Sequence, residues 1–161
     1  MNKLFLITGG NVGDRKKNLE TAAQLIQNKI GKIILSSKIY ETDAWGIRNQ
    51  NSFYNQVHVV ETDFSAEEVM KKILKIEEKM GRVRTIKNAA RVIDIDILFF
   101  NNDIVHEQNL TIPHPQIINR RFVLMPLDEI ASTKIHPLYK KNIHQLLLMC
   151  KDELKAVPLH D

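Results

Sequence analysis

The order of strand-forming and helix-forming segments limits most strongly what this chain can fold into. Runs of strand-forming residues lie at residues 3–8, 32–42, 53–61 and 92–100. Segments with the apolar period of an amphipathic helix lie at residues 14–29 and 65–80. The order β-α-β-β-α-β is that of the ferredoxin-like arrangement, an antiparallel sheet with two helices on one face. We therefore expect an α+β fold.

Local signals support these boundaries and extend the prediction toward the C-terminus. Asp14 is a suitable N-cap for the first helix, and Ser65-Ala66-Glu67-Glu68 is a capping box for the second. The turn Asn101-Asn102-Asp103 leads into a short fifth strand from Ile104, so we expect a hairpin after the fourth strand. Short helices are expected at 117–124 and 143–150, and loops at 43–52 and 82–91.

Length and composition favour one compact domain over residues 1–161. The chain is 43% hydrophobic and holds a single cysteine, so an internal disulfide is excluded. The apolar run Leu4-Phe5-Leu6-Ile7 is far shorter than the ~20 residues that a membrane span needs. The formal net charge of +4 gives little reason to expect a nucleic-acid partner. We expect a cytoplasmic monomer without nucleic-acid or membrane partners.

Two carboxylates share one face of the fourth predicted strand. In Ile93-Asp94-Ile95-Asp96-Ile97, alternation places both acids on one side, about 7 Å apart, and the isoleucines on the other. Carboxylates on so apolar a strand need a partner, and Mg²⁺ is a suitable one because it takes one or two carboxylates plus phosphate oxygens and water. An exposed strand face, or acids paired with nearby arginines, is the alternative.

Basic residues flank this strand on both sides. Gly81-Arg82-Val83-Arg84, Lys87 and Arg91 precede it, on a loop that could grip a polyphosphate or simply be solvated. After the strand, Pro113-His114-Pro115 restricts a histidine, and Asn119-Arg120-Arg121-Phe122 adds cations and an aromatic ring. A lone histidine is more often structural, so this segment indicates a ligand only together with its neighbours.

Two further features are ambiguous on their own. Phe53 and Asn55 share a strand face, and with Trp45 they could bind a flat heterocycle or simply belong to the core. Gly9-Gly10-Asn11-Val12-Gly13 lacks the G-x-G-x-x-G spacing of a dinucleotide site, and the chain has no G-x-x-x-x-G-K-[ST] phosphate loop.

Taken together, these segments resemble the 6-hydroxymethyl-7,8-dihydropterin pyrophosphokinases of folate biosynthesis. The matching blocks are Gly9-Gly10-Asn11, Phe53-Tyr54-Asn55, Gly81-Arg82-Val83-Arg84, Arg91-Val92-Ile93-Asp94-Ile95-Asp96-Ile97, Leu110-Thr111-Ile112-Pro113-His114 and Asn119-Arg120-Arg121-Phe122. They follow the order of the family at nearly its spacing. The resemblance implies transfer of a pyrophosphoryl group from ATP to the hydroxymethyl oxygen of the pterin, with release of AMP.

The resemblance also implies a role for each matching residue. Metal binding, of two Mg²⁺ ions, would fall to Asp94 and Asp96, and catalysis to these two acids with Arg82 and Arg91. ATP would be bound by Glu77, Arg82, Arg84, Arg91, Thr111, His114 and Arg120. The pterin would be bound by Thr42, Trp45, Phe53, Asn55 and Phe122.

Two segments depart from the family pattern. Lys87-Asn88-Ala89-Ala90-Arg91 replaces the usual Arg-Trp-Gly-Pro-Arg, in a loop about one residue shorter, and Thr42-Asp43-Ala44-Trp45-Gly46 replaces a proline-containing stretch. Two other classes were weighed against the resemblance. An RNA-binding module is disfavoured because the aromatic RNP1 pattern is absent and the acids would repel RNA. Another Mg²⁺-dependent nucleotidyl or phosphoryl enzyme remains an alternative.

Overall fold

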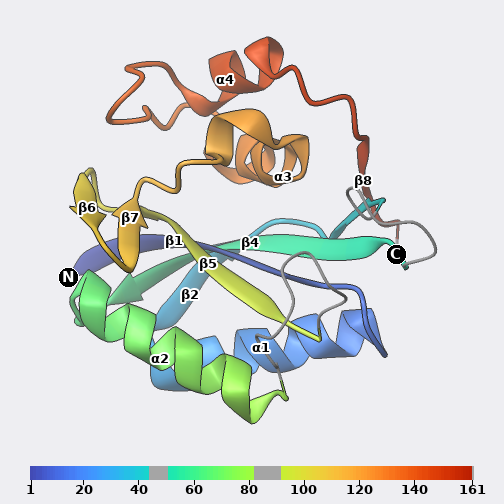
Figure 1. Cartoon of the computed structure of the whole chain (residues 1–161), viewed down its shortest axis with the longest axis vertical. Coiled ribbons are helices and arrows are strands. Elements are labelled where there is room, and N and C mark those ends of the chain that lie inside the picture. Colours follow the sequence, from blue (N-terminus) through green and yellow to red (C-terminus); the bar gives the residue numbers. More distant parts are fainter. Residues whose placement is uncertain (44–50, 82–91, 161) are drawn as a thin grey trace.

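The computed structural model describes residues 1–43, 51–81 and 92–160, and these form three layers. The middle layer is a sheet of β1 (Asn2–Gly10), β2 (Lys32–Ser36), β3 (Tyr40–Thr42), β4 (Phe53–Thr62), β5 (Asp94–Phe100) and β8 (Ala156–Pro158). Helices α1 (Arg15–Lys29) and α2 (Ala66–Lys79) cover one face (Figure 1). On the other face lies α3 (Arg121–Ala131), against which α4 (Ile143–Met149) packs.

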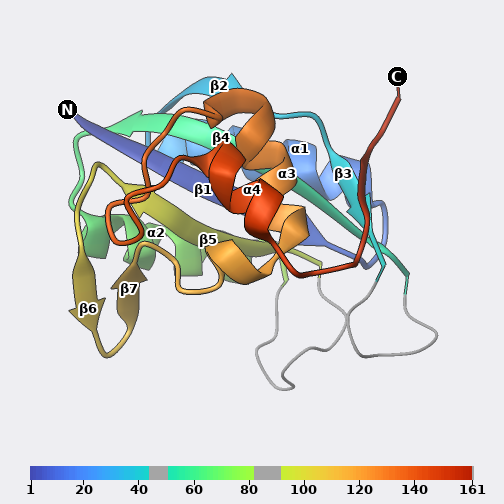
Figure 2. The ribbon, with the colours of Figure 1, turned by 90° about the horizontal axis from the view of Figure 1, so that it is seen from above.

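The strand order is β5-β1-β4-β3-β8, with β2 pairing β4 beside β3, and the pairs are antiparallel. The first two long strands along the chain, β1 and β4, are neighbours, and α1 and α2 lie on the same face (Figures 1 and 2). This arrangement confirms the predicted ferredoxin-like α+β fold. Within the described ranges, no helix combines the length and hydrophobicity that a membrane span requires.

Both predicted helix starts are confirmed by their caps. The Asp14 side chain accepts the N–H of Lys17 at 3.1 Å, which satisfies a donor of the first turn of α1. At α2, Ser65 accepts the N–H of Glu68, and the Glu68 side chain accepts the N–H of Ser65. These bonds begin both helices at the residues expected from the sequence.

Alternation along β1 divides the apolar residues between two cores. Leu4 and Leu6 pack with α1 and α2, whereas Phe5 and Ile7 pack with α3 and α4. Both faces of β1 are thus buried, which explains why its sequence is almost continuously apolar.

The predicted strand over residues 32–42 is wrong in its continuity, because it is broken between β2 and β3. Ser37 lies at the break and is buried. Its N–H donates to the Val57 carbonyl at 2.9 Å, and its Oγ accepts the Val57 N–H at 3.0 Å. The serine hydroxyl thereby replaces a backbone acceptor where the strand changes direction.

Three other differences concern the part of the chain after β5. The predicted fifth strand is β6 (Val105–Glu107), and it pairs only with β7 (Leu110–Ile112) in a separate hairpin. The predicted helix at 117–124 is a 3-10 turn, Ile117–Asn119, followed by the longer α3, which continues past Pro126. Strand β8 was not predicted, since it is three residues long and ends in proline; such a residue is tolerated at a sheet edge.

Candidate functional site

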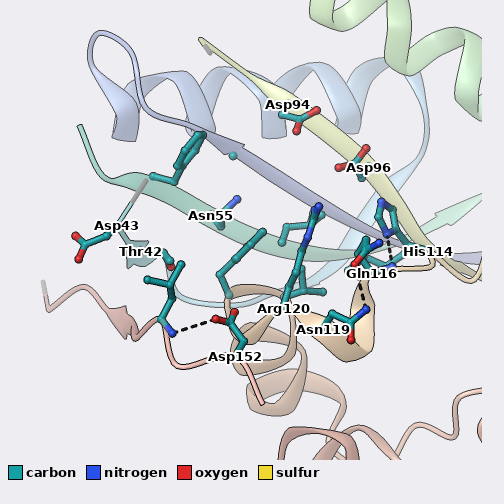
Figure 3. A pocket seen from close by; sticks show the side chains of 17 residues that line it. Thr42, Asp43, Asn55, Asp94, Asp96, His114, Gln116, Asn119, Arg120 and Asp152 are labelled. Atoms are coloured by element: carbon teal, nitrogen blue, oxygen red, sulfur yellow. Dashed lines mark hydrogen bonds between the residues drawn. The ribbon is translucent and has the colours of Figure 1, made fainter. Parts of the chain in front are cut away.

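A cavity of about 450 Å³ lies between the sheet and the start of α3 (Figure 3). Its described lining consists of Ile7, Gly9, Thr42, Asp43, Phe53, Asn55, Asp94, Asp96, Leu98, His114, Gln116, Asn119, Arg120, Phe122, Val123, Asp152 and Leu154. Figure 3 shows two ends. Asp94, Asp96, His114 and Arg120 gather at one end, and Thr42, Asp43 and Asn55 at the other.

The two acids of β5 project into the charged end of the cavity, as the alternation predicted. Asp94 and Asp96 are partly exposed and line the cavity, whereas Ile93, Ile95 and Ile97 are buried on the opposite face. The strand is therefore held from one side by hydrophobic packing while its other side remains open to a ligand.

The backbone of β5 is also held at its outer edge. Glu77 of α2 is only 1% exposed, and its Oε2 accepts the N–H of Ile95 at 2.9 Å. A charged acceptor makes a stronger hydrogen bond than a neutral one, so this contact fixes the strand at the residue between the two acids.

The donor set at this end suits a hard cation. Both side chains offer carboxylate oxygens, which are the ligands that Mg²⁺ prefers. Among the described residues no group of three or more His, Cys, Asp or Glu could hold a metal. A cation at Asp94 and Asp96 would therefore need oxygens from a ligand or from water, which is the usual situation for Mg²⁺ and unlike that of structural Zn²⁺.

His114 adds a neutral hydrogen-bond donor beside the acids. Its Nδ1 accepts the N–H of Gln116 at 3.1 Å, and its own backbone N–H donates to the Leu98 carbonyl at 3.0 Å. Burial, and then the charge of Arg120, lower the pKa of the imidazole, while Asp94 acts in the opposite direction. The neutral ring accepts at Nδ1, so it carries its proton on Nε2, where it can donate to an anionic oxygen.

The cation and the aromatic ring at the start of α3 lie close together. The Arg120 guanidinium carbon is 5.7 Å from the centroid of the Phe122 ring. Both residues line the cavity. One short stretch thus presents a cation that can bind a phosphate and a flat apolar surface that can stack on a ring.

The other end of the cavity offers polar groups in a buried setting. Thr42 is 3% exposed, and its Oγ1 has no hydrogen-bond partner among the described residues. Asn55 is 8% exposed and donates from Nδ2 to the Thr8 carbonyl at 3.4 Å. An unpaired buried polar atom is costly, so a ligand that hydrogen-bonds here would gain by satisfying it.

Gly9 makes room for the amide of Asn55. A Cβ atom at Gly9 would overlap Nδ2 of Asn55 and would lie 3.2 Å from the Tyr54 carbonyl. With glycine at this position, the Asn55 amide can lie against β1 without moving aside. This contact gives a physical reason for Gly9, which the dinucleotide interpretation did not explain.

The structure brings together most of the predicted site residues that it describes. The cavity is lined by Thr42, Phe53, Asn55, Asp94, Asp96, His114, Arg120 and Phe122. Glu77 and Thr111, predicted to bind ATP, are not in the described lining: Glu77 is buried behind β5, and Thr111 lies in the β6–β7 hairpin. Trp45, Arg82, Arg84 and Arg91 lie outside the described residues.

Several lining residues were missed by the sequence analysis. Gln116 directly follows the Pro113-His114-Pro115 segment, and Asn119 begins the matching block Asn119-Arg120-Arg121-Phe122 but was given no role, so both had a usable signal in the sequence. Asp152 and Leu154 gave no signal, because Asp152 is held at the cavity by a contact with Arg121, 31 positions earlier, and Leu154 is bonded to Asp152.

Comparisons with known proteins identify the family. The family model described as 7,8-dihydro-6-hydroxymethylpterin-pyrophosphokinase (HPPK) matches residues 5–132. A 2-amino-4-hydroxy-6-hydroxymethyldihydropteridine pyrophosphokinase of Aquifex aeolicus is 37% identical over 147 residues, which cover 90% of this chain and 90% of that protein. The folic acid synthesis protein FOL1 of Dictyostelium discoideum is 40% identical over 136 residues, covering 84% of this chain.

The chain spans only 20% of the length of that FOL1 protein, whereas it spans 90% of the length of the Aquifex protein. Among solved structures, Plasmodium falciparum HPPK-DHPS superimposes with a TM-score of 0.73 at 22% identity, covering 92% of this chain and 43% of that chain. At this identity the superposition supports the fold alone. From the match over residues 5–132 and the identity with the Aquifex protein, the chain belongs to the 7,8-dihydro-6-hydroxymethylpterin-pyrophosphokinase family.

Proposed function

We propose that this chain transfers the pyrophosphoryl group of ATP to the hydroxymethyl group of 6-hydroxymethyl-7,8-dihydropterin and releases AMP, a step of folate biosynthesis. The observation that supports this most is the two-ended cavity. Its charged end has two carboxylates, a cation and a neutral histidine, and its other end has a buried amide and a buried hydroxyl group. The rings of Phe53 and Phe122 also belong to the lining.

The end of the cavity that holds Thr42 and Asn55 suits a pterin. The edge of a pterin carries several hydrogen-bond donors and acceptors, for which the amide of Asn55 and the hydroxyl of Thr42 are suitable partners. The rings of Phe53 and Phe122 both line the cavity and would stack on the bicyclic ring. A pocket of about 450 Å³ lies in the usual range for small-molecule sites. Trp45, outside the described residues, is proposed to cover this end.

The charged end suits the triphosphate. Asp94 and Asp96 would hold two Mg²⁺ ions, which supply charge neutralisation to the phosphate oxygens when bound. His114 would donate from Nε2 to a phosphate oxygen, and Arg120 would pair with another. Both residues line the cavity on the side facing the acids (Figure 3).

The chemistry then depends on position and electrostatics. The hydroxymethyl oxygen forms a bond to the β-phosphorus, the bond from that phosphorus to the oxygen retained by AMP breaks, and the hydroxyl proton is lost to solvent. Arg82 and Arg91 are proposed to stabilise charge that develops on the phosphoryl oxygens, and Arg84 to bind ATP beside them. Water must be excluded because it would compete with the alcohol.

Two further assignments concern residues outside the described lining of the cavity. Glu77 is proposed to support the ATP site through the backbone of Ile95, since its carboxylate holds β5 between the two acids. Thr111 is proposed to act near the phosphates from the hairpin that precedes His114. A monomeric state and a cytoplasmic location stay predictions.

A product assay tests the proposed function. Purified protein is incubated with ATP, Mg²⁺ and 6-hydroxymethyl-7,8-dihydropterin, and nucleotides are separated by chromatography. We expect AMP in equal amount to the pterin pyrophosphate, and none without the pterin. Formation of ADP, or no turnover with the pterin, would contradict the proposal and favour another nucleotide-dependent enzyme. A reaction lacking Mg²⁺ serves as the control for the role of the two acids.

A further inference from the structure

The segment that follows α4, residues 150–158, forms one wall of the cavity. Asp152 and Leu154 both belong to the lining. The segment lies after residues 5–132, which match the family model, and none of its residues has a role in the function proposed above. Its position therefore needs an explanation from the contacts it makes.

The Asp152 carboxylate is held by hydrogen bonds on both of its oxygens. Oδ2 accepts the backbone N–H of Arg121 at 3.0 Å, and Oδ1 accepts the backbone N–H of Leu154 at 3.0 Å. The Arg121 side chain returns to the same segment: Nε donates to the Asp152 carbonyl at 2.9 Å and Nη2 to the Cys150 carbonyl at 3.2 Å. Three of these four hydrogen bonds connect Arg121 with residues 150–152, and the fourth lies within the 150–158 segment.

This contact supplies what the start of α3 lacks. The residue at the N-cap position is Arg120, and in the described part of the chain its side chain makes no capping bond. The first N–H groups of a helix need acceptors, which Asp, Asn, Ser or Thr usually provide from the cap position. Asp152 provides such an acceptor from a residue 31 positions later in the chain.

The residues on either side of Arg121 are those that enter the cavity. Arg120 and Phe122 line it, whereas the side chain of Arg121 reaches the 150–158 segment. The direction of Arg121 therefore determines the directions of its neighbours, because all three lie on one continuous turn of backbone. Loss of the contact would free the turn that carries the cation and the aromatic ring.

The same segment also holds the opposite wall. Its strand β8 pairs with β3, with Ala156 opposite Thr42. Beyond β8, the N–H of Leu159 donates to the Ile39 carbonyl at 2.8 Å. Residues 150–158 thus connect the start of α3 with the strand that carries Thr42 (Figures 1 and 2).

We propose that Asp152 is a positioning residue for the pterin: through Arg121 it sets the distance between Phe122 on α3 and Thr42 on β3. This inference rests on the proposed function, because it assumes that the end of the cavity with Thr42 and Asn55 binds the pterin. The triphosphate is expected to depend less on this contact: Arg120 lies on the same turn, but Asp94, Asp96 and His114 belong to other elements.

The experiment compares three variants by steady-state kinetics and by direct titration of the pterin. In Asp152→Ala both N–H groups lose their acceptor, and we expect the KM for the pterin to rise about fivefold or more, as for loss of a helix cap. The KM for ATP and kcat should change less. Asp152→Asn keeps one acceptor oxygen, so its KM for the pterin should lie between those of Asp152→Ala and wild type. Glu153→Ala, an exposed neighbour with the same charge change, is the matched control and should behave as wild type.

A second comparison separates positioning from a loss of stability. Arg121→Ala removes the two side-chain bonds to the segment, so its effect on pterin binding should not add to that of Asp152→Ala in the double variant. Asp152→Ala with a lowered Tm but wild-type pterin affinity in its folded fraction would overturn the inference. If wild-type protein forms no AMP, the proposed function fails, and the direct pterin titration of wild type and variants still tests this inference.

Discussion

The two faces of β5 differ in almost every physical respect although they alternate residue by residue. Ile93, Ile95 and Ile97 are at most 5% exposed and pack against α1 and α2. Asp94 and Asp96 are partly exposed and face the cavity beside α3. The first face is fixed by hydrophobic burial, and the second is kept polar at a cost to stability. The comparison indicates that one face holds the strand in place, and the other face is the one for which we propose the chemistry.

The largest effect is expected from a substitution that alters only the polar face of β5. Asp96→Ala removes a proposed metal ligand, and we expect kcat to fall at least about 1,000-fold, near the upper range for loss of one electrostatic group. The Tm should stay close to that of wild type, because no buried apolar contact is lost. Product formation and thermal unfolding measure the two effects separately. A wild-type rate in this variant would remove the argument for the metal site.

The converse substitution alters only the apolar face of β5. The Ile95 side chain is 1% exposed, so Ile95→Ala leaves a cavity in the core. The free energy of unfolding should therefore fall by about 3 kcal/mol. The kcat of the folded fraction should stay near that of wild type. Urea unfolding and activity at low denaturant provide the two readouts. If kcat collapsed while the protein remained folded, the division of labour between the faces would be wrong.

Two glycines sharpen the comparison between site and scaffold. A Cβ atom at Gly9 would overlap the Asn55 side chain, whereas one at Gly31 would overlap the Glu61 backbone carbonyl. The amide can rotate away, but the backbone must shift. Gly31→Ala should therefore lower the free energy of unfolding by about 2 kcal/mol. Gly9→Ala should mainly raise the KM for the pterin, about tenfold.

Unfolding curves and pterin titrations of the two glycine variants are compared side by side. Equal losses of stability in both, with unchanged pterin binding by Gly9→Ala, would show that Gly9 has only a structural role. That outcome would also weaken the assignment of Asn55 to the pterin.

The effect that develops most gradually is a pH dependence of stability, which arises at His58 on β4. Burial lowers the pKa of His58 from 6.5 to about 4, and its Nε2 has no hydrogen-bond partner among the described residues. In the unfolded chain His58 becomes protonated as the pH falls below 6.5, whereas in the folded chain it stays neutral down to about pH 4. The free energy of unfolding should therefore fall with decreasing pH in this window, by up to about 1.4 kcal/mol per pH unit.

His58→Gln is the control for this pH dependence. The difference in unfolding free energy between wild type and the variant should shrink as the pH falls from 6.5 toward 4. A difference that stays constant over this range would mean that His58 is not the group responsible.

The sequence predicted the parts of the fold that depend on local pattern. The caps at Asp14 and Ser65 and the alternation around Asp94 and Asp96 are local, and the structure confirms them. The break at Ser37 was missed because it depends on a contact with Val57 across the sheet, which the local run of strand-forming residues does not reveal.

The candidate site shows the same limit. His114 and Arg120 were singled out from the sequence because they lie in segments that match the family pattern, and both line the cavity. Asp152 could not, because its role arises only when the chain end packs on the start of α3. The space that Gly9 leaves for Asn55 likewise appears only when β1 and β4 pair.

One structure determination tests the central claim most directly: a crystal of the protein with Mg²⁺, a non-hydrolysable ATP analogue and 6-hydroxymethyl-7,8-dihydropterin. The account predicts Mg²⁺ on the carboxylates of Asp94 and Asp96, and the pterin between the rings of Phe53 and Phe122. Magnesium bound at other residues, or a pterin outside this cavity, would contradict it.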